Sequence, residues 1–341
     1  MKKKIKILVA DFSSIQRNVL SELFTAEKTM EVIGAVRTPK DCLATAIEER
    51  PSVIVIALRA PYLPWFEAIG SIMAQIPTPI IVLSNNSYTQ ATEALEKGAI
   101  EILPFSPHNK EQEKKLLQVI SIANNIVPIT HVRKHSSIGN THTPPSLINS
   151  KVIAVGASTG GPQSLKALLS SLPGDLNAGM LIVQHIATGF LPQMVEWLQN
   201  YTPLSLEVAH EGSVISPSKV LFAPTRSHMH VEANGTISLW SGARAPEKNF
   251  IPSIDITMTS AAQIYGKNMV GIIMTGIGKD GAEGMKAIQA AGGITIAQDK
   301  HSSVVFGMNK ECIEKGYIKT VLPLTDLSTE ILRITKYNLP V

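Results

Sequence analysis

Short apolar segments alternate with segments of helical spacing along most of the chain, and this alternation constrains the fold more than any other feature. Before residue 126 the predicted strands are 4–10, 32–36, 52–58, 79–84 and 101–103, and the predicted helices are 14–24, 40–49, 66–75, 89–97 and 109–125. Segment 52–58, SVIVIAL, is continuously apolar, which is typical of a strand buried on both faces. Five such units predict a parallel sheet with helices on both faces.

Residues 122–150 interrupt the alternation. They are rich in Ser, Thr, Asn, His and Pro and show neither a strand period nor a helical one. Such a composition is typical of a flexible linker between two folded parts. We therefore predict a first domain at 1–121, a linker at 122–150 and a second domain at 151–341.

The alternation resumes after the linker. Predicted strands lie at 151–156, 180–185, 269–276 and 293–298, and predicted helices at 163–172, 191–201, 253–265 and 280–291. Segments 230–233 and 236–240 flank Asn234-Gly235, a dipeptide typical of a tight antiparallel hairpin. The predicted fold class is α/β: two doubly wound parallel sheets, the second with an antiparallel hairpin insertion.

Composition narrows the class of protein further. Lys+Arg 31 against Asp+Glu 27 leaves a net charge of +4, which does not indicate a nucleic-acid binder. No apolar run approaches the ~20 residues of a membrane span, and Asp11 interrupts the short apolar run near the N-terminus. The two cysteines, Cys42 and Cys312, cannot form a disulfide framework and fit a reducing compartment. We expect a cytoplasmic protein without direct membrane insertion.

The segment Gly156-Ala157-Ser158-Thr159-Gly160 matches G-x-S-x-G, follows a predicted strand and opens a predicted helix. That context is typical of a nucleophile elbow, in which a sharp turn exposes the serine hydroxyl. The helix N-terminus adds backbone N–H groups that could face a developing oxyanion. A glycine-rich turn that packs a helix on a strand, or binds a phosphate, is the alternative interpretation.

A serine nucleophile needs a base and a group that orients the base. His185 closes the strand that follows, and Asp280 lies in the loop GIGKDGAEG after a later strand. Read singly, the histidine could be structural and the aspartate a helix N-cap. All three residues follow predicted parallel strands, so we expect them at one edge of one sheet. The order Ser…His…Asp differs from that of the α/β-hydrolases, which argues against an ordinary lipase or esterase fold.

His228 and His230 form an H-x-H pair that could suggest zinc. No third ligand is evident nearby, and the pair flanks the predicted hairpin. We therefore expect these histidines to line a surface or a cleft, and we predict neither a metal nor a cofactor.

Several long motifs of the second half resemble the bacterial chemotaxis protein-glutamate methylesterase family, CheB type. They are GASTGGP, IVQHIATGF, LFAPTRSHMHV, PSID, MTGIGKDGAEGM and AGGITIAQD…SSVVFGM, between about residues 151 and 324. The first half resembles a response-regulator receiver domain in ILVAD, ALRAP, IIVLS and GAIEILP. Together the two resemblances cover most of the chain.

The family resemblance implies hydrolysis of glutamate methyl esters on the cytoplasmic domains of chemoreceptors, and deamidation of receptor glutamines. At the matching positions of this sequence, the resemblance implies that Ser158 is the nucleophile, His185 the general base and Asp280 the residue that orients the base. It also implies the backbone N–H groups of Thr159 and Ile277 as candidate oxyanion donors. It implies methylated chemoreceptors as partners, with other chemotaxis signalling proteins as further candidates. A different serine hydrolase and a catalytically silent chemoreceptor-binding protein remain open as alternatives.

The chain departs from the two families at particular positions. The residue two before the proline of PSID is often histidine in methylesterases and is Phe250 here. Receivers carry an acidic pair after the first strand, where this chain has Asp11 and Phe12. The phosphorylated aspartate is replaced by Ala57, and the stretch 104–107 lacks the usual lysine. Alanine cannot accept a phosphoryl group, and one carboxylate is a poor Mg²⁺ site. We therefore predict a degenerate receiver without phosphorylation, biased by a protein partner instead.

Overall fold

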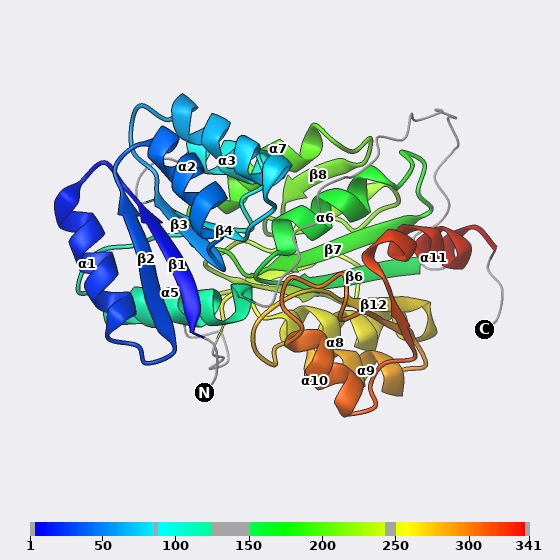
Figure 1. The fold of residues 1–341 in the computed structure, drawn as a ribbon. Coiled ribbons are helices and arrows are strands. Elements are labelled where there is room, and N and C mark those ends of the chain that lie inside the picture. Colours follow the sequence, from blue (N-terminus) through cyan, green and yellow to red (C-terminus); the bar gives the residue numbers. More distant parts are fainter. Residues whose placement is uncertain (1–3, 85–87, 125–150, 243–249, 338–341) are drawn as a thin grey trace. The chain divides into compact units, whose positions relative to one another are not determined.

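The computed structural model describes residues 4–84, 88–124, 151–242 and 250–337 of the chain (Figure 1). It divides into two compact units, Met1–His131 and Val132–Val341. The predicted linker at 122–150 falls almost entirely outside the described residues, so its boundaries stay a prediction. None of the described helices is both long enough and apolar enough to cross a membrane.

The first unit is a five-stranded parallel sheet with the order β2-β1-β3-β4-β5. Its strands are β1 (Ile5–Ala10), β2 (Met30–Val36), β3 (Val53–Ala57), β4 (Ile80–Leu83) and β5 (Glu101–Leu103). Its helices are α1 (Ser14–Thr25), α2 (Pro39–Glu49), α3 (Leu63–Gln75), α4 (Tyr88–Glu96) and α5 (Lys110–Ala123). This strand order is that of the flavodoxin-like fold, so the predicted doubly wound sheet is confirmed.

Local sequence explains where these helices begin. Ser13, Thr38 and Asn109 each precede a helix, and each side chain accepts a hydrogen bond from a backbone N–H in the first turn. Strand β3 is buried at every position, as the apolar run predicted. Its carboxyl end, at Ala57, lies at the same edge of the sheet as Asp11, which follows β1, because the two strands pair in parallel.

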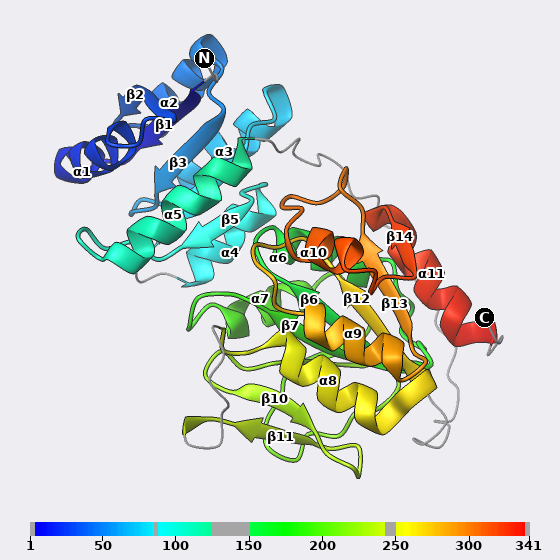
Figure 2. The ribbon, with the colours of Figure 1, turned by 90° about the horizontal axis from the view of Figure 1, so that it is seen from below.

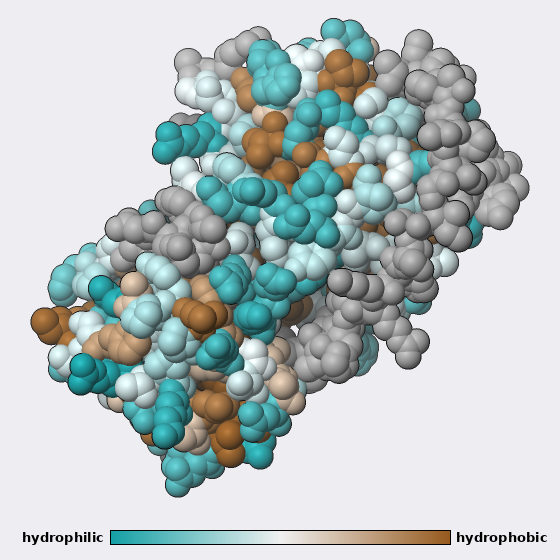
Figure 3. All heavy atoms as spheres, turned by 90° about the horizontal axis from the view of Figure 1, so that it is seen from above, coloured by the Kyte–Doolittle hydropathy of each residue, from teal (hydrophilic) through white to brown (hydrophobic). Residues whose placement is uncertain are grey.

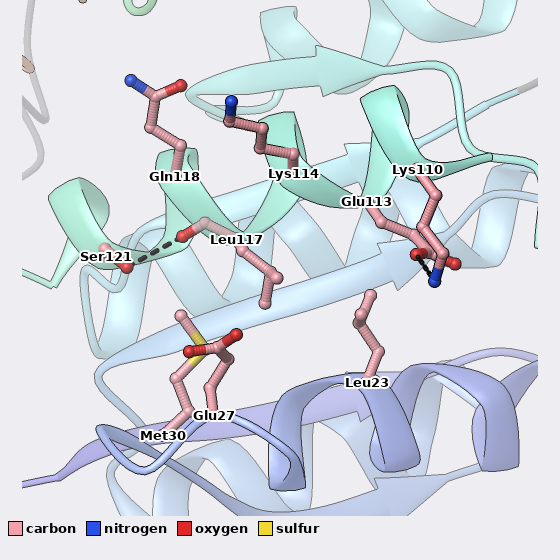
Figure 4. A pocket seen from close by; sticks show the side chains of 9 residues that line it. All are labelled: Leu23, Glu27, Met30, Lys110, Glu113, Lys114, Leu117, Gln118 and Ser121. Carbon is pink, nitrogen blue, oxygen red and sulfur yellow. Dashed lines mark hydrogen bonds and ion pairs between the residues drawn. The ribbon is translucent and has the colours of Figure 1, made fainter. Parts of the chain in front are cut away.

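Helices α1 and α5 border a groove of about 480 Å³ in the first unit (Figure 4). Its lining residues are Leu23, Glu27, Met30, Lys110, Glu113, Lys114, Leu117, Gln118 and Ser121. None of them is a site residue predicted from the sequence. On the face that Figure 3 shows, hydrophobic side chains lie in small groups among hydrophilic ones, an ordinary pattern for a protein surface.

The second unit is a seven-stranded parallel sheet with the order β14-β13-β12-β6-β7-β9-β8, and a separate antiparallel pair, β10 and β11. The strands are β6 (Lys151–Ala157), β7 (Ala178–Gln184), β8 (Ser205–Val208), β9 (Lys219–Phe222), β10 (His228–Val231), β11 (Ile237–Trp240), β12 (Met269–Ile273), β13 (Ile294–Gln298) and β14 (Thr320–Leu322). The helices are α6 (Gly161–Ser170), α7 (Leu191–Gln199), α8 (Ile254–Tyr265), α9 (Ala282–Ala290), α10 (Met308–Glu314) and α11 (Leu324–Tyr337), with a 3₁₀ turn at Gly266–Asn268.

The predicted sheet and hairpin of the second unit are confirmed, but five elements were not predicted. These are β8, β9, β14, α10 and α11. The outermost strands, β8 and β14, are short and have no fully buried residue, so they leave no apolar run in the sequence. Figure 2 shows β12, β6 and β7 in the middle of this sheet, where the burial is greatest.

Candidate active site

The structure places Ser158, His185 and Asp280 at the carboxyl edge of the second sheet. Ser158 follows β6 directly, His185 follows β7 directly, and Asp280 lies in the loop between β12 and α9. Strand β6 pairs with β7 on one side and with β12 on the other. The three residues therefore come from the three central strands, at the edge where parallel sheets of this kind bind ligands.

The turn that carries Ser158 admits only very small neighbours. Gly160 has a left-handed φ of 78°. A Cβ atom at Gly156 would lie 2.6 Å from Cγ2 of Ile254, and one at Gly160 would lie 2.4 Å from Cβ of Val304. The Gln184 amide donates to the Ser158 carbonyl at 2.8 Å. The G-x-S-x-G spacing is thus a packing requirement as well as a chemical signature.

His185 and Asp280 form the central contact of the site. Nε2 of His185 lies 2.9 Å from Oδ2 of Asp280, and both side chains are nearly buried. The same carboxylate accepts hydrogen bonds from the Ser253 hydroxyl at 2.9 Å, from the Ile254 N–H at 2.7 Å and from the Asp255 N–H at 3.1 Å. These donors form the N-terminus of α8, where the helix dipole favours a negative charge.

The environment of Asp280 keeps it ionised. Burial by itself would raise the pKa of this carboxyl, but the hydrogen bond and charge of His185, together with the N–H groups of Ile254 and Asp255, outweigh burial and lower the pKa. A carboxylate with a lowered pKa can hold the imidazole in one orientation and stabilise it when it becomes charged.

The alternative interpretation of Asp280 as the N-cap of its own helix is wrong. The residue before α9 is Gly281, with no side-chain capping bond. The N–H groups of Gly281 and Gly284 instead donate to Oδ1 of Asp255, each at 2.9 Å. Asp255 thus caps α9 while Asp280 accepts from the N-terminus of α8. This reciprocal exchange locks the two helix starts together beside the site.

The second ring nitrogen of His185 is not used by the contact with Asp280. Nδ1 is buried and has no hydrogen-bond partner among the described residues, Ser158 included. Hydrogen bonds of catalytic groups are often incomplete without substrate. Oγ1 of Thr159, next to the serine, is likewise buried without a described partner.

The candidate oxyanion donors lie on the two loops beside Ser158. Ser158 N donates to Thr275 O at 3.0 Å, and Gly276 N donates to Val305 O at 3.0 Å. No backbone–backbone hydrogen bond of the described chain uses the N–H of Thr159 or of Ile277. These two groups therefore stay proposals for the oxyanion role.

An aromatic ring covers the imidazole. Phe250 stacks on His185 with ring centroids 4.6 Å apart and an angle of 10° between the planes. Sequence reasoning singled out Phe250 only as a departure from a family pattern. The ring stacking depends on the path of the chain before α8, which no local pattern reveals.

The expectation that the H-x-H pair lines a surface or cleft is wrong for His228. This residue is fully buried, and its Nδ1 accepts a hydrogen bond from the Ser253 N–H at 3.0 Å. His230 stacks on Trp240, with ring centroids 3.9 Å apart. The described parts of the chain contain no group of three His, Cys, Asp or Glu side chains suited to hold a metal ion.

At the corresponding edge of the first sheet, Asp11 is fully buried and paired with a cation of the chain itself. Its Oδ1 accepts from Ser13 N at 2.8 Å and lies 3.3 Å from Nε of Arg59. Burial raises the pKa of Asp11, although Ser13 and Arg59 oppose that effect. Ala57 offers no side-chain oxygen, so these residues do not supply the carboxylates of the Mg²⁺ site of a receiver domain.

The remaining receiver positions are occupied by apolar groups. Phe12, in place of the second acidic residue, packs edge-on against Trp65 with ring centroids 5.2 Å apart. Phe105, in the stretch that lacks lysine, is 1% exposed. Apolar side chains therefore occupy the positions at which a receiver domain has an acidic metal ligand and a lysine.

Comparison with known proteins agrees with the two-part architecture. A family model described as CheB methylesterase matches residues 153–331. A protein-glutamate methylesterase/protein-glutamine glutaminase 3 of Paramagnetospirillum magneticum is 34% identical, with 97% of this chain and 96% of the relative covered. A protein-glutamate methylesterase/protein-glutamine glutaminase of Thermotoga maritima is 32% identical, with coverages of 97% and 98%.

Among solved structures, the Thermotoga maritima CheB methylesterase catalytic domain is similar to the second unit. It is 34% identical with a TM-score of 0.53, and the match covers 55% of this chain and all of that domain.

Proposed function

The chain belongs to the CheB methylesterase family, and from that premise we propose that it hydrolyses glutamate methyl esters on chemoreceptors with Ser158, His185 and Asp280. The observation that carries this assignment is the buried contact between His185 and Asp280, beside a serine on a nucleophile elbow. The intact set of three side chains favours an active enzyme over a silent binding protein.

The geometry supports a two-step acyl transfer. Nδ1 of His185 accepts the proton of the Ser158 hydroxyl as Oγ attacks the ester carbonyl carbon. Nε2 carries the other ring proton and donates it in a hydrogen bond to Oδ2 of Asp280. The imidazolium then gives its Nδ1 proton to the departing methoxide, so methanol leaves and a glutamyl ester of Ser158 remains.

Water completes the cycle at the same site. Nδ1 of His185 takes a proton from water as the oxygen attacks the acyl carbon, and the proton passes to Oγ of Ser158 when the acyl bond breaks. The products are a receptor whose glutamate side chain carries a carboxylic acid, and the resting serine. The N–H groups of Thr159 and Ile277 would stabilise the oxyanion in both steps.

A side-chain amide can enter the same sequence, with ammonia in place of methanol as the leaving group. The curated relatives carry the double name of methylesterase and glutaminase. We therefore include glutamine deamidation on chemoreceptors in the proposal. The acyl intermediate and the second step would be identical for both substrates.

The proposed substrates place the protein in chemotaxis signalling, acting in the cytoplasm on the cytoplasmic domains of chemoreceptors. We further propose that residues 122–150 link two independently folding domains. Limited proteolysis should cut within 126–148 and release a fragment from Lys151 onward that retains esterase activity. A full chain slower than the fragment would indicate that the first domain restrains the site; equal rates would indicate that it does not.

The test of the function is methanol release from methylated chemoreceptor. Ser158→Ala should lower kcat by about 10⁴–10⁶-fold, the range seen when a member of a catalytic triad is removed. Ser170→Ala, at the end of α6 and outside the site, is the matched control and should keep wild-type turnover. Normal turnover in Ser158→Ala would refute the assignment. Hydrolysis of small esters without activity on receptors would favour the alternative of a different serine hydrolase.

A further inference from the structure

Phe250 touches the base of the proposed triad without belonging to the triad. Its ring lies parallel to the imidazole of His185, with centroids 4.6 Å apart. Phe250 is 38% exposed, whereas the His185 side chain is 9% exposed. One face of the imidazole is therefore covered by a ring that itself meets water.

The imidazole ring of His185 is contacted at one edge and on one face. Asp280 holds the Nε2 edge at 2.9 Å, and Phe250 covers a face, while Nδ1 has no partner among the described residues. A hydrogen bond at Nε2 alone would let the ring tilt about the axis of that bond. A flat ring stacked on its face opposes the tilt, so Nδ1 keeps one direction.

Phe250 also lies beside the loop that carries Ile277. A Cβ atom at Gly278 would lie 3.8 Å from Cε2 and Cζ of the phenyl ring, which is ordinary packing distance. Further along the chain, Ser253 donates to Asp280 at 2.9 Å. One short segment therefore contacts the base, borders a candidate oxyanion loop and holds the orienting carboxylate.

We propose that Phe250 is a positioning residue of the esterase: its stacked ring fixes the plane of the His185 imidazole and shields that imidazole from water. This inference rests on the proposed function, because it assigns Phe250 a part in the same reaction. Phe250 itself takes no proton and forms no bond.

Four full-length variants test the proposal by methanol release: Phe250→Ala, Phe250→Leu, Phe250→Tyr and Ile251→Ala. Loss of the ring in Phe250→Ala should lower kcat about tenfold and leave KM within about twofold. Leucine keeps apolar bulk without a flat ring, so kcat should fall at least about threefold. Tyrosine should restore kcat to within about twofold of wild type. Ile251→Ala, an exposed neighbour on the same segment, is the matched control and should match wild type.

A second readout needs no substrate. The rate at which diethyl pyrocarbonate modifies His185, followed by mass spectrometry of its peptide, should rise several-fold in Phe250→Ala and stay near the wild-type rate in Phe250→Tyr. A purely structural loss would not be rescued selectively by an aromatic residue. If Phe250→Ala does not fold, Phe250→Leu carries both measurements.

Any of three results would overturn the positioning role. These are a wild-type kcat in Phe250→Leu, an unchanged rate of His185 modification in the variants that lack the ring, and a kcat in Phe250→Tyr that stays below half of the wild-type value. Failure of the proposed function is recognised separately, by equal methanol release from wild type and Ser158→Ala. In that case the modification rates still decide whether Phe250 shields His185.

Discussion

The two sheets of this protein each bring a buried aspartate to their carboxyl edge, yet the two carboxylates have opposite surroundings. Asp280 meets a hydroxyl, two backbone N–H groups and the His185 imidazole, and its pKa is lowered. Asp11 meets one N–H group and the Arg59 guanidinium; its Oδ2 has no partner among the described residues, and its pKa is raised.

The contrast shows that a parallel sheet supplies only the position, whereas the neighbouring donors decide what a carboxylate can do. At the second edge the α8 N-terminus keeps Asp280 charged and leaves it available to His185. At the first edge Arg59 forms an ion pair with Asp11, and Phe12 packs against Trp65. The described side chains at the first edge therefore contact one another.

The largest expected difference between the edges is in turnover. Asp280→Asn should lower kcat for methanol release by about 10⁴-fold, because an amide cannot hold the imidazole in the required tautomer. The same substitution at the other edge, Asp11→Asn, is the matched control and should leave kcat within about threefold. A large loss of kcat in Asp11→Asn would contradict this prediction, since it would give the first edge a part in catalysis.

The next expected effect is on local stability of the first sheet. Arg59→Met removes the ion-pair partner of the buried Asp11 carboxylate. Because the Arg59 side chain is 50% exposed, solvent screening reduces the loss, and we expect about 1–2 kcal/mol. Hydrogen exchange in β1 and β3 should quicken about tenfold, while β6 and β12 stay unchanged.

Two further variants sharpen this test. Adding Asp11→Asn to Arg59→Met removes the uncompensated charge and should restore most of the protection. Lys219→Met breaks an ion pair with Glu207 whose partners are both partly exposed, and it should change exchange in its own strand by less than about threefold. Unchanged exchange in β1 after Arg59→Met would show that Arg59 does not stabilise this edge.

The smallest expected effect is on how the folding stability depends on pH, which the shifted pKa values of the two carboxyl groups determine. The lowered pKa of Asp280 means that its contribution to folding stability is fully present above the ordinary carboxyl value of about 3.9 and is lost as pH falls through the lowered pKa. The raised pKa of Asp11 gives the opposite sign: its contribution is present at low pH and is lost as pH rises through the raised pKa.

Carbon NMR of the two carboxyl groups, assigned with the Asp→Asn variants, measures both titrations in the intact protein. The midpoint of Asp280 should lie below the ordinary value and that of Asp11 above it. The reverse order would show that the donors at the α8 N-terminus do not control Asp280.

Sequence reasoning predicted that the three candidate site residues lie at one edge of the sheet, because that placement follows from the strand pattern; their roles were inferred from the G-x-S-x-G motif and the family resemblance. Ser158, His185 and Asp280 each follow a strand with a clear apolar run, and parallel strands end at one edge. The same reasoning could not predict that Asp280 accepts from α8 rather than capping α9, since its donors lie 25–27 residues away in the chain.

Contacts between side chains from distant segments could not be predicted from the sequence either. Arg59 stood inside the receiver-like segment ALRAP without any sign that it pairs with Asp11, 48 residues earlier in the chain. His228 is polar and sits in a short strand, yet it is fully buried because the start of α8 supplies a hydrogen-bond donor. Such burial becomes visible only once tertiary packing is known.

Intact-mass measurement after two covalent probes tests whether the second edge, and not the first, carries out chemistry. A serine-directed fluorophosphonate should add one group, located at Ser158 by peptide mapping, and abolish methanol release. A small phosphodonor with Mg²⁺ should add no phosphoryl group and leave the rate unchanged. A stable phosphoryl group on the first domain with faster turnover, or full methanol release after complete modification of Ser158 by the fluorophosphonate, would contradict these assignments.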